Sequence, residues 1–293
     1  MESQLESETA PAASVSPAAT YEIRGGGELR LQAREWGNPD GPELLLIHGW
    51  SQCDLCWTKQ VSGDLASRFR MVTFDLRGHG LSEQPQDPGH YTDERFWADD
   101  VAAVIKQTGL QRPVVVAWSY GGLVITDYLR TYGAVAVAGL NLVGGAVMLK
   151  PPSFDRIGPG FLENAGDASA SDLATNISAI KRFLRACTVG ELDEREWTTA
   201  LCWNMVVPPA IRGALISREV DGTAALAALS VPVLVTHGRE DTIVSSSMAE
   251  HVLSTCGTAV PSWYDEVGHM PFWEAPGRFD RELTALVERC RDA

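Results

Sequence analysis

The feature of this sequence that most limits its fold is a series of short apolar runs separated by helical stretches. The runs are nearly continuous, as expected for strands that are buried on both faces of a sheet. The intervening residues 93–106 instead repeat apolar side chains at a helical period behind an acidic first turn. This alternation predicts a mostly parallel, doubly wound α/β sheet with right-handed crossovers. The runs are 43–47 (ELLLI), 71–74 (MVTF), 113–117 (PVVVA), 137–143 (VAGLNLV) and 233–236 (VLVT).

The beginning of the chain differs from this pattern. Residues 1–20 are rich in Ala, Ser, Pro and Glu and contain no Lys or Arg. A signal peptide has a basic start and a transit peptide is rich in Arg, so we expect an untethered, flexible tail here. Residues 21–24 and 28–35 flank three consecutive glycines. That arrangement predicts an opening β-hairpin.

The alternation also breaks between residues 144 and 226. This stretch has few strand-like runs, and residues 171–187, 191–205 and 209–218 read as helices. We therefore expect an α/β core built from residues 21–143 and 227–293, with residues 144–226 inserted between two strands as a helical lid. A lid of this kind is where substrate specificity is often decided.

Charge and composition narrow the function. The chain has 24 basic and 38 acidic residues, a net charge of −14, which argues against binding to nucleic acids or anionic membranes. Its longest apolar stretch, residues 135–147, is shorter than a membrane-spanning helix. We expect a cytoplasmic enzyme that acts on a small molecule; a homo-oligomer is compatible with the sequence.

The cysteines and histidines do not suggest a metal or a cofactor. Cys53 and Cys56 form the single CxxC in the sequence, with no second pair to complete a zinc site, and we expect reduced thiols there. The six histidines occur singly, without the spacing of a metal motif. Three glycines at 25–27 lack the lysine of a phosphate-binding loop, so no nucleotide is expected.

A serine lies at the junction of a buried strand and a helix. The run PVVVA leads into Trp118-Ser119-Tyr120 and two glycines, and a helical stretch follows. At such a sharp turn the serine hydroxyl is held outward, and the helix N-terminus adds a positive field. A simple helix-capping serine is the alternative. The strand–turn–helix context favours a nucleophile.

A nucleophilic serine needs a base, and the base needs a group that orients it. Asp241 follows the strand VLVT, and His269 follows the last strand, near residues 262–264. The chain order serine, acid, histidine is the one expected when the three groups occupy successive strand ends. Glu240 adjoins Asp241, but it falls one position short of the expected place.

An anion site is expected beside the serine. The strand ELLLI ends in His48-Gly49-Trp50, where the glycine permits a tight turn and Trp50 offers an N–H group. The N–H of Tyr120, directly after Ser119, would be the second donor. His48 is interpreted as part of the turn, because His269 better fits the position of the base. Trp118 and Trp273 are candidate pocket residues, although Trp273 could equally pack against the histidine loop.

These motifs resemble those of the α/β-hydrolase family over residues 21–293. Around His48 the chain looks most like bacterial aryl esterases and cofactor-free haloperoxidases. The resemblance implies that the Asp-x-Arg-Gly-x-Gly element is a structural turn and not catalytic. The matching segments are His48-Gly49-Trp50, Asp75-Leu76-Arg77-Gly78-His79-Gly80, Trp118-Ser119-Tyr120-Gly121-Gly122, Gly238-Arg239-Glu240-Asp241 and Gly268-His269.

The same resemblance removes some activities. Haloalkane dehalogenases and most epoxide hydrolases of this fold use an aspartate nucleophile, and this chain has Ser119. Prolyl aminopeptidases place a tryptophan after the serine, whereas Trp118 precedes it here. Two positions depart from the family pattern: Ala117 replaces the usual first glycine of the turn, and Ser51 replaces the proline common in haloperoxidase-like members.

The sequence therefore predicts a serine hydrolase that cleaves a small carboxylic ester or lactone through an acyl-enzyme. Ser119 attacks the carbonyl, His269 moves the proton, and Asp241 orients His269. Three alternatives share this pocket: a hydrolase of C–C bonds in diketones, a slow-turnover ligand receptor, and a lyase or acyltransferase. The shape of the lid decides between them, and the sequence does not reveal that shape.

Overall fold

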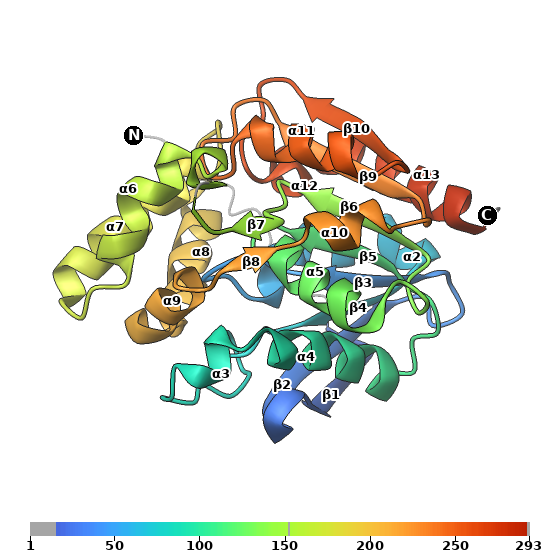
Figure 1. The fold of residues 1–293 in the computed structure, drawn as a ribbon, viewed down its shortest axis with the longest axis horizontal. Helices are drawn as coiled ribbons and strands as arrows, with labels where there is room; N and C mark the ends of the chain where they lie inside the picture. The colour runs from blue at the N-terminus through green and yellow to red at the C-terminus, as the bar shows by residue number, and fades with distance from the viewer. Residues whose placement is uncertain (1–15, 152, 292–293) are drawn as a thin grey trace, which may run out of the picture.

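Within residues 16–151 and 153–291, which the computed structural model describes, eight strands form one sheet (Figure 1). The strands are β1 (Ala19–Arg24), β2 (Arg30–Gly37), β3 (Glu43–Ile47), β4 (Arg70–Phe74), β5 (Val114–Trp118), β6 (Gly139–Val143), β9 (Val233–Gly238) and β10 (Ala259–Tyr264). Their order is β1-β2-β4-β3-β5-β6-β9-β10. Only β2 pairs antiparallel, with β1 and β4, and every other pair is parallel. The predicted mostly parallel α/β sheet is confirmed.

Helices cover both faces of this sheet. On one face α4 contacts α5, α5 contacts α10, and α10 contacts α11; on the other α1, α12 and α13 contact one another. Side chains of β3 and β5 between the two layers are almost wholly buried, which explains their continuous apolar sequences. These helices are α1 (Thr58–Val61), α4 (Glu94–Gln107), α5 (Gly121–Tyr132), α10 (Thr223–Ala227), α11 (Ser246–Thr255), α12 (Pro271–Glu274) and α13 (Pro276–Arg291).

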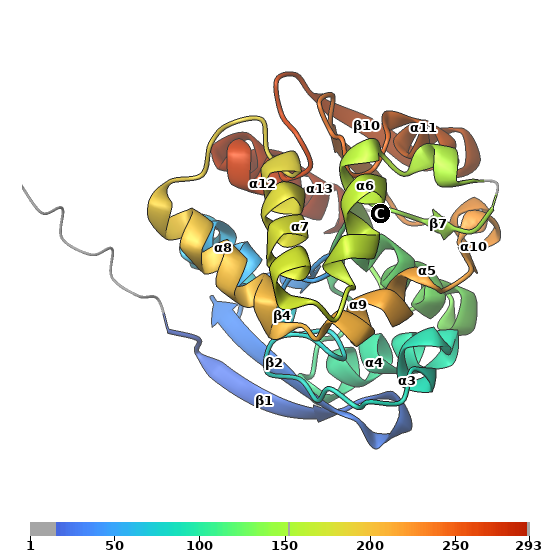
Figure 2. The same ribbon diagram turned by 90° about the vertical axis from the view of Figure 1, so that its left-hand side faces the viewer.

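The stretch between β6 and β9 is a mostly helical insertion. It contains α6 (Pro159–Ala168), α7 (Leu173–Ala186), α8 (Glu194–Val206), α9 (Pro209–Ile216) and the short antiparallel pair β7 (Met148–Leu149) with β8 (Val220–Asp221). Figures 1 and 2 show α6 to α9 gathered at one edge of the molecule. The Trp50 ring, which follows β3, meets Phe161 of α6 and Phe183 of α7 edge-on. The insertion therefore packs over the carboxyl ends of the strands.

Two predicted boundaries fall inside elements of the structure, and one helix was not predicted. Strand β1 begins at Ala19, so the end of the predicted tail joins the sheet, while residues 1–15 lie outside the described residues. The predicted lid limit at residue 226 falls inside α10, which packs against α5 and α11. Helix α6 was not predicted, because residues 159–168 contain two glycines and little apolar periodicity.

No single helix of the described ranges is long and apolar enough to span a membrane, although the bent pair α8–α9 together meets the length and composition criteria.

The Asp-x-Arg-Gly-x-Gly element is a structural turn, as the resemblance implied. The Arg77 guanidinium is fully buried and makes two 2.7 Å bonds to the Asp100 carboxylate in α4. It also donates to the carbonyls of Gly26 and His90, so the turn, the opening hairpin and α4 are tied together. A buried charge pair of this kind is costly to break, because the remaining partner stays desolvated.

We expect Arg77→Met to lower the free energy of unfolding by about 3–5 kcal/mol, since it leaves the Asp100 carboxylate buried without a counter-charge. Urea titration followed by circular dichroism measures this loss. The matched control is Arg68→Met, because Arg68 pairs with Glu288 at the surface, where an ion pair contributes less than about 1 kcal/mol. Equal losses in the two variants would contradict the role given to Arg77.

Candidate active site

Ser119 lies at the turn between β5 and α5 in a strained backbone conformation. Its φ is +56°, in the left-handed region that serine rarely adopts. The backbone N–H of Ser119 donates to the Val143 carbonyl at the end of β6, and its own carbonyl accepts from Gly122 and Ala146. These bonds hold the strained turn in place, and strain of this kind concentrates at functional sites.

Glycines allow the backbone to approach this turn closely. A Cβ atom on Gly49 would lie 2.9 Å from the Ser119 Cβ, and one on Gly121 would lie 2.7 Å from the Ile47 carbonyl oxygen. Both distances are shorter than van der Waals contact, so larger residues would push the loops after β3 and β5 apart. The departure at Ala117 is tolerated, because its small side chain is fully buried within β5.

His269 and Asp241 form a buried pair. The His269 Nδ1 atom lies 2.7 Å from the Asp241 Oδ2 atom, and both side chains are almost wholly excluded from solvent. Ionised Asp241 can only accept here, so Nδ1 carries the proton and Nε2 bears the lone pair. Nε2 is buried and makes no hydrogen bond to any described residue, Ser119 included. The pair is assembled, and its free nitrogen remains available to a reacting group.

The environment of Asp241 favours its charged form. Burial alone would raise the pKa of this carboxyl, but the neighbouring His269 and His237 and the backbone N–H of Val244 together hold it below its usual value. Asp241 Oδ1 accepts hydrogen bonds from the N–H groups of Ile243 and Val244, at 2.8 and 3.0 Å. The carboxylate is thus fixed in position and ionised where it faces His269. By contrast, the neighbouring Glu240 is exposed.

The loop that carries His269 is fastened on both sides. The His269 backbone N–H donates to the Cys187 carbonyl at the end of α7. The His269 carbonyl accepts from the Trp118 indole N–H at 2.9 Å. Gly144 lies directly against the pair, since a Cβ there would be 3.0 Å from both Asp241 Oδ2 and His269 Nδ1. Strand ends β5, β6 and β9 therefore meet at the histidine.

Two unpaired backbone donors flank Ser119. The N–H groups of Trp50 and Tyr120 make no hydrogen bond to any part of the chain that the structure describes. Both residues line the same small cavity as Ser119. Convergent free N–H groups beside a candidate nucleophile are suited to stabilising a developing negative charge.

The cavity beside Ser119 is apolar and small, with a volume of about 30 Å³. None of the described residues that line it is charged, and the insertion contributes Leu149, Ile157, Phe161 and Ile216. Trp118 and Trp273 are not among the residues that line it. Trp118 packs against His269 and Phe272, and Trp273 packs between Lys59 and Trp203.

Comparison with known proteins identifies the family of this chain. The model of the α/β hydrolase family matches residues 44–282. The chain belongs to the α/β hydrolase family. It is 30% identical to a bifunctional esterase/perhydrolase of Acinetobacter calcoaceticus over 227 residues, covering 72% of this chain and 78% of that protein.

Two solved esterase structures superpose closely on this chain. An esterase from Rhodococcus sp. ECU1013 superposes with a TM-score of 0.87 at 33% identity, covering 92% of this chain and 98% of the other. A putative aryl esterase from Burkholderia cenocepacia gives 0.88 at 34% identity, covering 94% of this chain and 100% of the other. These relatives support ester hydrolysis in general.

Two of the three histidines in the family motifs, His48 and His79, have structural contacts. The His48 Nε2 atom accepts from the Leu76 N–H and its Nδ1 donates to the Gly49 carbonyl, while burial lowers the pKa of His48 to about 4. His79 is likewise buried, and its Nε2 accepts from the Ser51 N–H. Both rings are neutral at ordinary pH and shape the loop after β3, as the sequence interpretation of His48 proposed.

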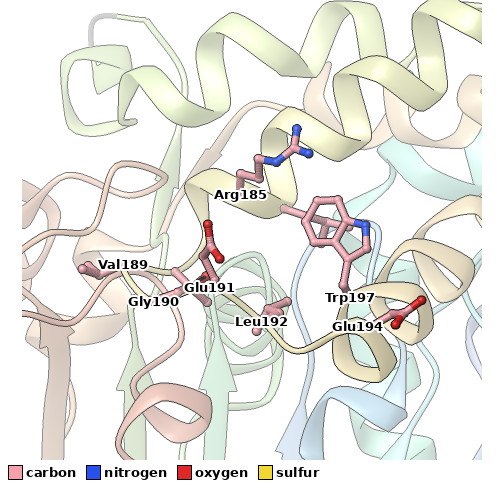
Figure 3. Close-up of a pocket in the computed structure, with 9 residues that line it drawn as sticks. Arg185, Val189, Gly190, Glu191, Leu192, Glu194 and Trp197 are labelled. Carbon is pink, nitrogen blue, oxygen red and sulfur yellow. Dashed lines mark hydrogen bonds between the residues drawn. The ribbon is translucent and has the colours of Figure 1, made fainter.

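A second, larger hollow lies on the insertion of this hydrolase. It measures about 470 Å³ and is lined by α7, α8 and the segment that joins them. Figure 3 shows Arg185 above the Trp197 ring, with 5.0 Å between the guanidinium carbon and the ring centre. Ser119, Asp241 and His269 are absent from its lining, so this hollow is separate from the candidate active site.

One cluster of possible metal ligands is paired with an arginine side chain. Cys53, Asp54 and Asp75 bring ligand atoms within 4.8 Å of one another. The Arg34 guanidinium pairs with Asp54 and lies 3.7 Å from Asp75, which supplies the counter-charge for both carboxylates. The Cys53 and Cys56 thiols are free and buried, and burial raises the pKa of each well above its usual value. These groups are accounted for by packing and charge pairing.

The sequence interpretation missed three residues near the site. His237 approaches Asp241 Oδ2 at 3.6 Å, and two buried arginines of the insertion, Arg212 and Arg218, reach toward Ser51 and Tyr120. One signal was available: Asp127 is a charged residue within an apolar helical stretch, which indicates a buried ion pair. Its partner, Arg218, is 91 residues away and could not be identified from the sequence.

We expect Asp241→Asn to reduce ester hydrolysis by a factor on the order of 10⁴, because the amide would favour the wrong tautomer of His269. Glu240→Gln is the matched control and should retain most of the activity, since the Glu240 side chain is exposed. Initial rates with a p-nitrophenyl ester measure both variants. An inactive Glu240→Gln beside an active Asp241→Asn would assign the acid to Glu240.

Proposed function

We propose that this protein is a serine hydrolase that cleaves small carboxylic esters or lactones through an acyl-enzyme formed on Ser119. The observation that carries the proposal is the buried Asp241–His269 pair, whose Nε2 has a free lone pair and whose histidine carbonyl is bonded to Trp118, the residue before the strained Ser119. Unpaired donors on Trp50 and Tyr120 and the esterase relatives support the same reading.

The proposed reaction has two stages. In the first, Ser119 Oγ bonds to the ester carbonyl carbon, its proton passes to His269 Nε2, and the carbonyl electron pair moves to oxygen. The N–H groups of Trp50 and Tyr120 stabilise that oxyanion, each by about 3 kcal/mol. The intermediate then expels the alkoxide, which takes the proton from Nε2. Water repeats these steps on the acyl-enzyme and releases the acid.

Asp241 acts through His269 in this scheme. When Nε2 takes up a proton the ring becomes cationic, and the adjacent carboxylate stabilises it. Because the pKa of Asp241 is held below its usual value, the carboxylate stays ionised over the pH range in which histidines titrate. Protonation of Asp241 is therefore not expected to limit activity in that range.

The size of the cavity suggests the substrate class. A lining of aliphatic and aromatic side chains favours an uncharged acyl group, and a volume of about 30 Å³ favours a short one. We further propose that the insertion acts as a lid, since α6 and α9 supply Phe161 and Ile216 to the cavity wall. The net charge of −14 disfavours anionic substrates.

We expect kcat/KM to be highest for acetyl and butyryl p-nitrophenyl esters and to fall for octanoyl and longer chains, with γ- and δ-lactones tested in the same panel. Ser119→Ala should lower turnover by a factor on the order of 10⁴ or more. A fluorophosphonate should add one label to the wild-type chain, detected by intact mass, and none to Ser119→Ala.

The matched control for this test is Ser62→Ala, since Ser62 is an exposed serine that should be silent. Full turnover by Ser119→Ala would refute the mechanism. A wild-type chain that cleaves diketones and not esters would instead assign C–C bond hydrolysis to the same residues.

A further inference from the structure

Backbone carbonyls of helix α9 in the insertion accept hydrogen bonds from the side chains of Trp50 and Tyr120, the two residues whose backbone N–H groups are unpaired. The Trp50 indole N–H donates to the Arg212 carbonyl at 3.3 Å. The Tyr120 hydroxyl donates to the Leu215 carbonyl at 3.2 Å. Trp50 follows β3 and Tyr120 follows β5, so two loops of the core are joined through one helix that belongs to neither.

Arginine side chains of the same segment reach back toward these loops. The Arg212 Nε atom donates to Ser51 Oγ at 2.8 Å, directly after Trp50, and Arg218 Nη1 donates to the Tyr120 hydroxyl at 3.0 Å. Four hydrogen bonds therefore run between the segment 212–218 and the loops that carry the two free N–H groups. Arg218 is held in turn by a buried ion pair with Asp127 of α5.

Arg212 is a fully buried cation whose partners are all neutral. Besides Ser51 Oγ, its guanidinium donates to the Ala168 carbonyl, the Asn176 side chain and the Asn204 carbonyl. Burial without a carboxylate lowers the pKa of Arg212 to about 10. A buried charge without a counter-charge carries a desolvation penalty that its hydrogen bonds must offset.

The loop that Arg212 contacts is strained. Ser51 has a φ of +61°, and its N–H donates to His79 Nε2 at 3.2 Å. A proline, as in haloperoxidase-like relatives, could make neither this bond nor the one through Oγ. The Trp50 N–H belongs to the preceding peptide, between Gly49 and Trp50, which is joined to the Ser51 peptide through the Trp50 Cα. Hydrogen bonds that hold Ser51 therefore restrict the backbone on one side of the Trp50 donor.

We propose that the segment 212–218, which is the end of α9 and the two residues after it, is a positioning element that aligns the backbone donors of Trp50 and Tyr120 for the transition state. The inference rests on the proposed function of those donors as an oxyanion hole. Electrostatic stabilisation requires donors already aimed at the developing charge, and an error below 1 Å is enough to weaken it. The insertion then contributes to rate as well as to the shape of the pocket.

Two single-hydroxyl deletions test the proposal: Tyr120→Phe and Ser51→Ala. Ser51→Ala removes the one bond that the Ser51 hydroxyl makes with the segment 212–218, and Tyr120→Phe removes the two made by the Tyr120 hydroxyl. Both variants leave the two backbone donors in the chain. Removing an oxyanion donor outright costs about 10²–10³ in kcat, so misalignment of one should lower kcat about 10-fold, with KM changed less than about twofold. Binding of an aryl trifluoromethyl ketone, whose adduct on Ser119 carries the oxyanion, should weaken in parallel with kcat/KM.

The double variant Ser51→Ala/Tyr120→Phe shows whether the two hydroxyls act through the same helix or independently on their own loops. If both hydroxyls act through α9, the double variant should lose less than the product of the single losses. Tyr128→Phe is the matched control: Tyr128 is a buried tyrosine of α5 whose hydroxyl bonds to no described residue, and its removal should leave kcat unchanged. Urea titration of every variant confirms that the assays compare folded proteins.

Failure of this inference is distinct from failure of the proposed function. A wild-type chain without Ser119-dependent hydrolysis would remove the oxyanion hole itself. If the wild type is active through Ser119, the α9 proposal is overturned by any of three results. These are unchanged kcat and ketone affinity in both variants, a change in KM alone, or losses that multiply independently in the double variant.

Discussion

The candidate active site depends on the parallel pairing of β3, β5, β6 and β9. Parallel strands end at the same edge of a sheet, so the loops that follow them converge there. Glycine at position 49 lets the loop after β3 come within contact distance of Ser119, and glycine at position 144 does the same between β6 and His269. Without this close approach of backbones, the functional groups would be too far apart to act on one atom.

Buried charges hold the elements around this edge. Arg77 joins the turn after β4 to α4, and Arg218 joins the insertion to α5. Arg34 lies between Asp54, which follows β3, and Asp75, which follows β4. Each of these cations has an acidic partner, which offsets the cost of its desolvation. Arg212 differs, because it is held by neutral oxygens alone, and it lies where the insertion meets the strained loop at Ser51.

Much of the architecture could be predicted because the sequence signals for it are local. The run ELLLI gave the limits of β3 without error, and the residues around Ser119 indicated a strand, a turn and a helix in succession. The insertion was recognised by the loss of alternation, but α6 escaped, since its contacts with α7 and α9 stabilise a segment of weak helical pattern. The sequence left the place of Trp273 open, because an aromatic residue near a motif can face either the cavity or the core.

The sequence by itself determined the fold class and the three chain positions at which reactive groups follow strands, because both are encoded in local periodicity and spacing. The family motifs also identified Asp75, Arg77 and His79 as parts of a turn. Only the tertiary structure decided which acid meets His269, where the cavity lies, and that α9 touches both flanks of Ser119. Those facts depend on contacts between residues as much as 162 positions apart, as between Trp50 and Arg212, and no local pattern specifies such pairs.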